Sequence, residues 1–169
     1  TRLPASNVTN CSSKKVWDHM RKHVSTMPSS TSLACCTLVS WNANSLPRKE
    51  LELLCNLRQY PFVICGVSEA RMQYLASSDD SFVDLARHGF HVLGYPRFRQ
   101  GVLVYLSPSL NVKPLMNFCI CIEDLCVVSL LLDDLVIVFA YCHDGNRVRG
   151  HTQLWDLVDQ IKVSYSRVI

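Results

Sequence analysis

Residues 35–69 read CCTLVSWNANSLPRKELELLCNLRQYPFVICGVSE, and this stretch decides the expected fold. Cys35 to Trp41 is a short apolar run without helical period, which predicts a buried strand. Pro47 opens a helix that is predicted to run to Tyr60, with Leu51, Leu54 and Leu57 on one face. Phe62 to Val67 is the next apolar run and predicts a second strand. Strand, helix and strand in this order predict a crossover unit whose two strands lie parallel.

Downstream of this unit the chain is predicted to add mainly strands. Asp79 to His88 is predicted as a helix that ends at Gly89. Asp133 and Asp134 split a long apolar run, which predicts a hairpin at that point. The further elements expected are strands at Phe90–Tyr95, Gly101–Ser107, Asn111–Phe118, Leu125–Leu131 and Leu135–Tyr141, and a final helix at Gly150–Val163. The expected fold class is therefore α/β.

Residues 1–32 have a different character from residues 33–169, and we expect them to form a separate basic leader that contains Ser and Pro. Residues 1–30 carry five basic side chains and one acidic one, so their net charge is +4 within a total of +3. Apolar residues at helical spacing predict a short amphipathic helix from Lys14 to Ser25. The leader is either an arm that contacts phosphates, a retained targeting segment, or a solvated tail.

Composition narrows the class of protein. The chain has 169 residues, which fits one domain, and 49% apolar against 18% charged residues favour an ordered core over disorder. The apolar run that Asp133 and Asp134 interrupt falls short of the roughly 20 residues that a membrane helix needs. The nine cysteines lack the paired spacing of a structural zinc site, so thiols in a reducing compartment are expected. We therefore expect an intracellular protein, nuclear or mitochondrial, with no membrane partner.

Polar side chains follow three of the predicted strands directly. These clusters are Trp41-Asn42-Ala43-Asn44, Ser68-Glu69-Ala70-Arg71 and Tyr141-Cys142-His143-Asp144. In α/β sheets such positions line the ligand crevice at the carboxyl ends of strands. Glu69 emerges from an apolar strand, and a divalent cation such as Mg²⁺ could balance its charge. A helix cap or a surface salt bridge explains Glu69 equally well.

Taken in order, these clusters and their strands resemble motifs of the endonuclease/exonuclease/phosphatase family. The closest resemblance is to the apurinic-type endonuclease domain of non-LTR retrotransposons, and it covers roughly residues 34–169. The matching segments are Leu38–Leu46 with its Trp-Asn, Ile64–Glu69 with its terminal Glu, the Gly-Val strand Gln100–Leu106, the Tyr-ending strand Val136–Tyr141 and the helical Thr152–Asp156.

The resemblance implies both a fold and a chemistry. The fold would be the N-terminal half of a four-layer α/β sandwich, one mixed β-sheet with flanking helices, truncated before the second half. The activity would be that of a Mg²⁺- or Mn²⁺-dependent endonuclease acting on DNA or RNA. Glu69 would bind the metal, and Asn42 would sit beside both the metal and the scissile phosphate. Asn44 would orient a neighbouring catalytic group, and Tyr141 would donate to the phosphate or to the attacking water.

Two motifs of the family are missing from this chain, namely the Gly-Asp-Phe-Asn strand and the late Ser-Asp-His. We therefore expect weak or absent metal binding and no turnover by this chain alone. The alternative is a non-catalytic remnant that serves as a structural or RNA-binding component of a larger ribonucleoprotein. A phosphoesterase for a small molecule or a lipid is a third reading. His143 and His151 are expected to be surface or core histidines rather than substitutes for the missing base.

A half sandwich should leave one face of its sheet uncovered. We therefore expect a partner chain, or a missing C-terminal half, to cover that face. The residues expected on it are Val102, Val104, Val127, Ser129, Leu131, Val136 and Val138.

Overall fold

The computed structural model describes residues 24–27, 36–76, 78, 81–97, 101–143 and 147–169, and these form a mixed α/β structure made mostly of strands. Its strands are β1 (Val24–Met27), β2 (Cys36–Asn42), β3 (Val63–Ser68), β4 (Val83–Arg87), β5 (Phe90–Tyr95), β6 (Val102–Leu106), β7 (Val112–Pro114), β8 (Ile120–Cys121), β9 (Leu125–Leu132), β10 (Leu135–Cys142) and β11 (Arg167–Val168). Its α-helices are α2 (Glu50–Leu57) and α3 (Arg147–Ser164), and two 3₁₀ turns lie at Gln73–Leu75 and Met116–Phe118.

The strands form two sheets. The first has the order β1-β2-β3-β6-β5-β4, and the second has the order β11-β10-β9-β7 with β8 paired to β9. In the first sheet β2 and β3 are parallel, as the crossover unit predicts, and the other neighbours are antiparallel. The hairpin of β9 and β10 turns at Asp133 and Asp134, which confirms that prediction.

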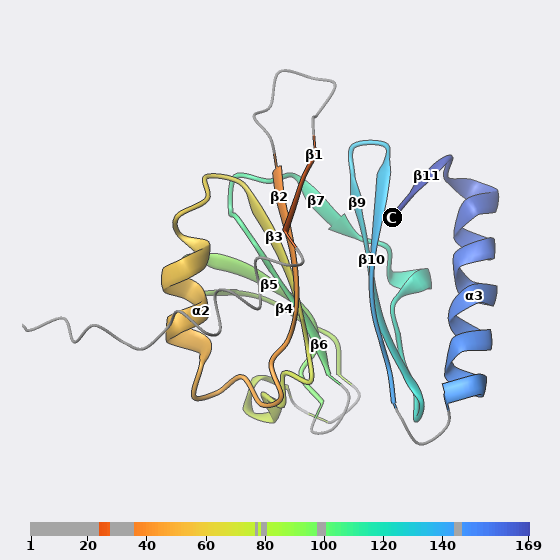
Figure 1. Cartoon of the computed structure of the whole chain (residues 1–169), viewed down its shortest axis with the longest axis horizontal. Coiled ribbons are helices and arrows are strands. Elements are labelled where there is room, and N and C mark those ends of the chain that lie inside the picture. Colours follow the sequence, from red (N-terminus) through yellow and green to blue (C-terminus); the bar gives the residue numbers. More distant parts are fainter. Residues whose placement is uncertain (1–23, 28–35, 77, 79–80, 98–100, 144–146) are drawn as a thin grey trace, which may run out of the picture.

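Figure 1 shows the two sheets face to face, with α2 beside the six-stranded sheet and α3 beside the other sheet. Three clusters of buried side chains match this order. One joins α2 to the six-stranded sheet and includes Leu54 and Val67. A second fills the space between the sheets and includes Val104 and Phe139, and a third joins the second sheet to α3 through residues such as Ile161.

Close contact between the sheets depends on Gly66 in β3. A Cβ atom at this position would lie 2.0 Å from Cδ1 of Phe139, which reaches across from β10. Glycine therefore lets the aromatic ring lie directly on the backbone of β3. This contact fixes the spacing of the two sheets beside the strand ends where the polar clusters lie.

The helix after β2 is confirmed, but its buried face differs from the predicted one. Leu54 and Leu57 are buried as expected, whereas Leu51 is 70% exposed and Leu53 takes its place in the core. The helix begins at Glu50 rather than at Pro47, and the intervening residues form a turn. The buried face therefore consists of Glu50, Leu53, Leu54 and Leu57, at helical spacing.

The helix expected at Asp79–His88 is wrong. Residues 83–87 form β4, which pairs antiparallel with β5 through a turn at His88 and Gly89. Both turn residues have positive φ, 51° and 83°, which matches the twist of a two-residue hairpin turn. The glycine that suggested a helix stop is therefore a hairpin glycine.

The expectation of one mixed sheet with a bare face is also wrong. Val102 and Val104 are buried between the two sheets, whereas Val127 and Val136 pack toward α3. Ser129 is fully buried and donates to the carbonyl of Phe118 at 2.8 Å. The chain itself covers these strands because the connection after β6 crosses from the first sheet to the second. This burial removes the argument that a partner must cover the face.

The basic leader lies mostly outside the described residues. Of its predicted helix, Val24 and Ser25 are described, and they belong to β1, which pairs antiparallel with β2. The helical prediction is wrong at these two positions. At least this part of the segment joins the sheet of the main domain.

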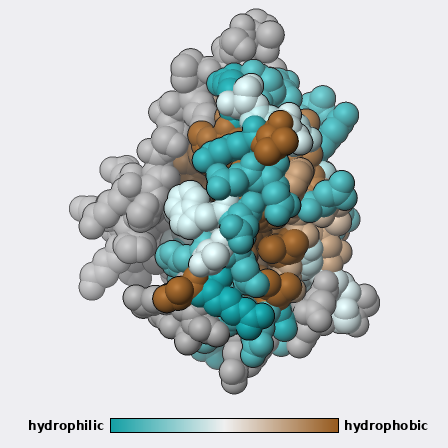
Figure 2. Space-filling view, turned by 90° about the vertical axis from the view of Figure 1, so that its right-hand side faces the viewer, coloured by the Kyte–Doolittle hydropathy of each residue, from teal (hydrophilic) through white to brown (hydrophobic). Residues whose placement is uncertain are grey.

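The outer surface around α3 is mainly hydrophilic, with separate hydrophobic spots (Figure 2). Val148, Trp155 and Val163 of α3 are 82%, 60% and 87% exposed. Among the described residues, no helix combines the length and the apolar character that a membrane span requires.

Candidate functional site

Three of the predicted site residues meet at one end of the two sheets. Glu69 follows β3, and its Oε1 atom accepts a hydrogen bond from Nδ2 of Asn42 at 2.9 Å. The same oxygen accepts a bond from the hydroxyl of Tyr141 at 2.8 Å. Asn42 ends β2 and Tyr141 lies near the end of β10, so three strands from both sheets contribute to one cluster.

Backbone pairing explains why Asn42 and Glu69 meet. In the parallel pair of β2 and β3, Asn42 is in register with Ser68, so both strands end at the same edge. Beyond the strands the two loops remain bonded to each other. Ala43 N–H donates to the Ser68 carbonyl at 3.0 Å, and Ser45 N–H donates to the Glu69 carbonyl at 3.0 Å. The site is thus held by main-chain bonds as well as by side chains.

The loops of the site contain most of the unusual backbone in the described structure. Asn44, Ser45, Glu69 and Arg71 have φ values of 42°, 81°, 53° and 54°. They make up four of the six non-glycine residues with positive φ in the described residues. Each such residue costs about 1–2 kcal/mol, and strain of this kind collects at functional sites. Glu69, one of these four residues, reaches Asn42 and Tyr141 across the strand ends.

Two cations lie next to this cluster. Arg71 places Nη2 3.2 Å from Oε2 of Glu69, and the two side chains are 37% and 16% exposed. Lys49 donates to the carbonyl of Ala43, and its Nζ lies 5.8 Å from the centre of the Trp41 ring. Arg71 balances the charge of the Glu69 carboxylate, and Lys49 stabilises the loop that follows Asn42.

The donor set allows only a limited metal site. Among the described residues no three His, Cys, Asp or Glu side chains come together to hold an ion. Glu69 is a single carboxylate, and Mg²⁺ can be bound through one or two carboxylates with waters and substrate phosphate. The Oδ1 atom of Asn42 accepts from the N–H of Asn44 at 3.1 Å, so its amide turns the NH₂ group toward Glu69. A cation at Glu69 would have to displace Arg71.

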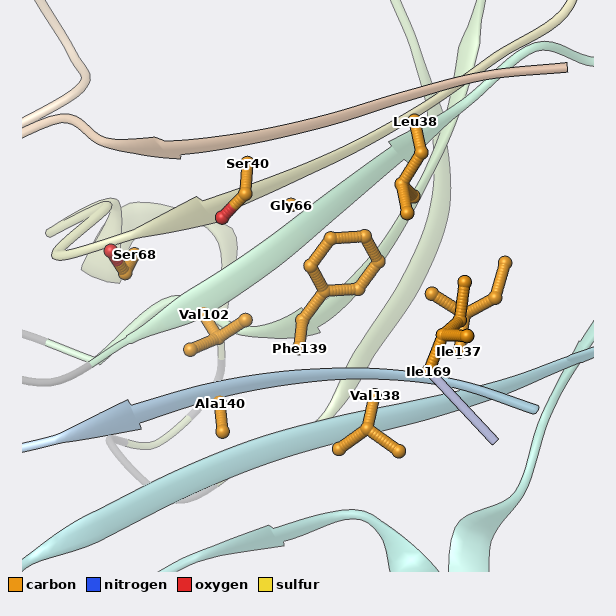
Figure 3. A pocket seen from close by; sticks show the side chains of 10 residues that line it. All are labelled: Leu38, Ser40, Gly66, Ser68, Val102, Ile137, Val138, Phe139, Ala140 and Ile169. Atoms are coloured by element: carbon orange, nitrogen blue, oxygen red, sulfur yellow. The ribbon is translucent and has the colours of Figure 1, made fainter. Parts of the chain in front are cut away.

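A cleft of about 350 Å³ lies between the sheets beside this cluster (Figure 3). Ser68 and Ala140, which directly precede Glu69 and Tyr141, form part of its wall. The remaining lining residues are Leu38, Ser40, Gly66, Val102, Ile137, Val138, Phe139 and Ile169. The wall is mostly apolar, with hydroxyl groups at Ser40 and Ser68. The polar cluster therefore lies beside an apolar cleft.

The structure brings some of the predicted site residues together and leaves others apart. Asn42, Glu69 and Tyr141 converge, as the strand-end pattern predicts. Asn44 lies in the same loop, but its backbone N–H, rather than its side chain, bonds to Asn42. His143 is partly buried and His151 is exposed on α3, whereas Asp144 lies outside the described residues.

Sequence reasoning assigned no role to Arg71 or Lys49. Arg71 belongs to the polar cluster after β3, and its position two residues beyond Glu69 is the only signal that could have drawn attention to it. Nothing in the spacing shows that Lys49 reaches back to the Ala43 carbonyl.

No family model and no curated protein matches this chain.

Proposed function

We propose that this chain carries part of a metal-dependent phosphodiesterase site for nucleic acid, centred on Glu69. The observation that carries the proposal is the shared carboxylate: Asn42 and Tyr141, from different sheets, both donate to Oε1 of Glu69. The proposal includes a finer fold, the four-layer α/β sandwich of the endonuclease/exonuclease/phosphatase type. The order of helix, sheet, sheet and helix supports that part.

Each residue has a role in this proposal. Glu69 binds Mg²⁺ or Mn²⁺, and such an ion stabilises charge on a phosphate and helps to form hydroxide near neutral pH. The Tyr141 hydroxyl and the Asn42 amide are donors, so they suit phosphate oxygens once Glu69 is engaged elsewhere. Arg71, released from Glu69, has a planar guanidinium that matches the geometry of a phosphate.

Hydrolysis needs a general base and further acidic groups beside the metal ligand. Among the described residues, no three His, Cys, Asp or Glu side chains come together to supply them. We therefore propose that this chain alone does not cleave nucleic acid, and that additional acidic and histidine groups complete the reaction.

A second candidate is a non-catalytic module that binds RNA within a larger ribonucleoprotein assembly. The ion pair of Arg71 with Glu69 favours it, because a carboxylate that is already neutralised has less need of a metal. In this case the basic residues 1–30 contact phosphates, and binding weakens steeply with added salt. Metal ions then leave the affinity for RNA unchanged.

Titration of the purified chain with Mn²⁺, followed by electron paramagnetic resonance, tests the metal site. We expect weak, saturable binding that Glu69→Gln abolishes. Arg71→Ala removes the competing cation and should tighten binding by up to about fivefold, because a partly exposed ion pair is worth up to about 1 kcal/mol. Asp84→Asn is the matched control, because Asp84 is an exposed carboxylate that also has a basic side chain, His91, as its partner. Equal binding by the wild type and Glu69→Gln would contradict the proposal.

Cleavage and binding assays separate the two candidates. Plasmid nicking by the pure chain with Mg²⁺ or Mn²⁺ should stay at background. Robust nicking that Glu69→Ala removes would show that the chain already holds a whole site. RNA binding that persists in Glu69→Gln, together with no Mn²⁺ binding, would favour the non-catalytic module.

A further inference from the structure

Two cysteines face each other across β8 and β9. Cys121 is the register partner of Cys126, and at the next step Ile122 N–H donates to the Leu125 carbonyl at 2.9 Å. Hydrogen-bonded and non-hydrogen-bonded pairs alternate along antiparallel strands, so Cys121 and Cys126 form a non-hydrogen-bonded pair. The Cα atoms of such pairs lie about 4.5 Å apart with their side chains on one face. This separation falls within the range of about 4.4–6.8 Å that a disulfide spans.

The two sulfur atoms are reduced and in contact. Their side chains lie within hydrogen-bonding reach of each other, and neither forms a disulfide in this structure. Cys126 is buried, whereas Cys121 is partly exposed. Arg97 places Nη1 3.9 Å from Sγ of Cys121 and donates to the Ile122 carbonyl at 3.3 Å. A guanidinium in this place favours the thiolate form that reacts with oxidants.

We propose that Cys121 and Cys126 form a reversible redox dithiol, in which a peroxide converts the pair to a cross-strand disulfide. Cys121 reacts first, because it is the more exposed thiol and lies beside Arg97, while burial raises the pKa of Cys126. The proposal rests on strand pairing and side-chain contact alone and is independent of the proposed function.

The chemistry balances in two steps. The Cys121 thiolate attacks one oxygen of the peroxide, the O–O bond breaks, and the departing hydroxide takes up the thiol proton as water, which leaves a sulfenic acid. The sulfur of Cys126 then attacks the sulfur of Cys121, and the S–O bond breaks. The hydroxyl leaves as a second water with the proton from Cys126. The two thiols lose two electrons and two hydrogens, and the peroxide is reduced to water.

The pair lies in line with the candidate site. Cys126 is the register partner of Tyr141 on its other side, so one row across three strands contains Cys121, Cys126 and Tyr141. Tyr141 is the residue whose hydroxyl donates to Glu69. Oxidation would therefore change β9, the strand that pairs with β10. Tyr141 of β10 donates the hydrogen bond to Glu69.

Glu123 lies between the two cysteines, which makes the bond easy to map. The whole chain is treated with hydrogen peroxide, remaining thiols are alkylated, and the chain is cut with a protease that cleaves after Glu. The expected product is a pair of peptides, 70–123 and 124–169, joined until a reductant is added, in which Cys119 and Cys142 are alkylated and Cys121 and Cys126 are not. Cys121→Ser and Cys126→Ser should both lose it. Cys55→Ser, which changes an exposed thiol on α2, should retain it.

Separate alkylation of Cys121 and Cys126 after oxidation would overturn the proposal. A dominant link between Cys119 or Cys142 and Cys126 would overturn it as well. The mapping in the wild-type chain decides the question even if a serine at the buried position 126 prevents folding.

Discussion

Two carboxylates in this molecule have the same kinds of partners and opposite surroundings. Glu50, in the first turn of α2, accepts bonds from Nε and Nη2 of Arg87 at 2.7 and 2.8 Å and from the Tyr105 hydroxyl at 2.9 Å. Glu69 accepts from Tyr141 at 2.8 Å and faces Arg71 at 3.2 Å. Each combines an acid, an arginine and a tyrosine.

Geometry and burial distinguish Glu50 from Glu69. The Glu50 side chain is 6% exposed and held by a two-pronged arginine contact, with the Tyr74 ring 5.5 Å from that guanidinium. Glu69 is 16% exposed and sits in a left-handed turn with a single arginine contact. The first group joins helix α2 to β4 and β6, whereas the second lies at an open strand edge. Residue types alone therefore do not distinguish the two groups, but backbone strain and exposure do.

Removing the charge of Glu50 should have the largest effect. Glu50→Gln leaves the Arg87 guanidinium, whose side chain is 24% exposed, without its counter-ion. We expect the free energy of unfolding to fall by about 3 kcal/mol. Glu69→Gln should lower it by no more than about 1 kcal/mol, because Arg71 can turn to solvent. Urea denaturation of both variants measures the difference. Equal losses would erase the contrast between the two groups.

The tyrosines give a smaller version of the same contrast. Tyr105 is fully buried, and burial raises the pKa of its hydroxyl, which donates to Glu50. Tyr105→Phe should cost about 1.5 kcal/mol, since a hydrogen bond to a charged group is lost. Tyr141→Phe should cost about 0.5 kcal/mol, because its hydroxyl lies near solvent. A larger loss from Tyr141→Phe would make the Glu69 cluster a structural element instead.

Relief of backbone strain should stabilise the loop of the site and an ordinary turn alike. Ser45 has φ 81° in the loop that bonds to Glu69, so Ser45→Gly should raise the free energy of unfolding by about 1 kcal/mol. His88, at φ 51° in the β4–β5 turn, is the control, and His88→Gly should give a similar gain without affecting Mn²⁺ binding. Thermal unfolding and Mn²⁺ titration of both variants test this. A loss of stability in Ser45→Gly would show that its backbone is unstrained.

Lowering the pH should reduce the stabilisation by the Glu50 group, and this effect should be smaller than those of the substitutions above. Burial works to raise the pKa of Glu50, but the bonds from Arg87 and Tyr105 outweigh it, and the pKa lies below its ordinary value of 4.5. A lowered pKa means that the stabilisation is complete above that ordinary value and is lost as pH falls through the folded-state pKa. Between about pH 6 and pH 3, the wild type should therefore lose more stability than Glu50→Gln. Parallel urea curves at several pH values check this, and identical slopes would contradict it.

Local features of the sequence predicted part of the first sheet and the central hairpin of the second. The apolar runs that became β2 and β3, the helix between them and the β9–β10 hairpin all follow from nearby residues. The same reasoning placed Asn42 and Glu69 together, because parallel strands end at one edge. Tyr141 followed from its position at the end of an apolar run and from the family resemblance.

The remaining features of the fold depend on contacts between residues far apart in the sequence, which local patterns do not reveal. Residues 79–88 have apolar side chains that also fit a helix, and only pairing with β5 makes residues 83–87 a strand. The division into two sheets depends on which strands pair across the chain. Glu50 gave no signal either, since Arg87 and Tyr105 lie 37 and 55 residues away.

The most direct test of the central claim, that Glu69 rather than Glu50 is the accessible carboxylate, is NMR of the labelled chain with Mn²⁺. Paramagnetic broadening falls off steeply with distance from the ion. We predict that the side-chain signals of Asn42 and Tyr141 broaden at low Mn²⁺ while that of Tyr105 stays sharp, and that Glu69→Gln restores the first two. Broadening that spares Asn42 and Tyr141, or that survives Glu69→Gln, would contradict the account.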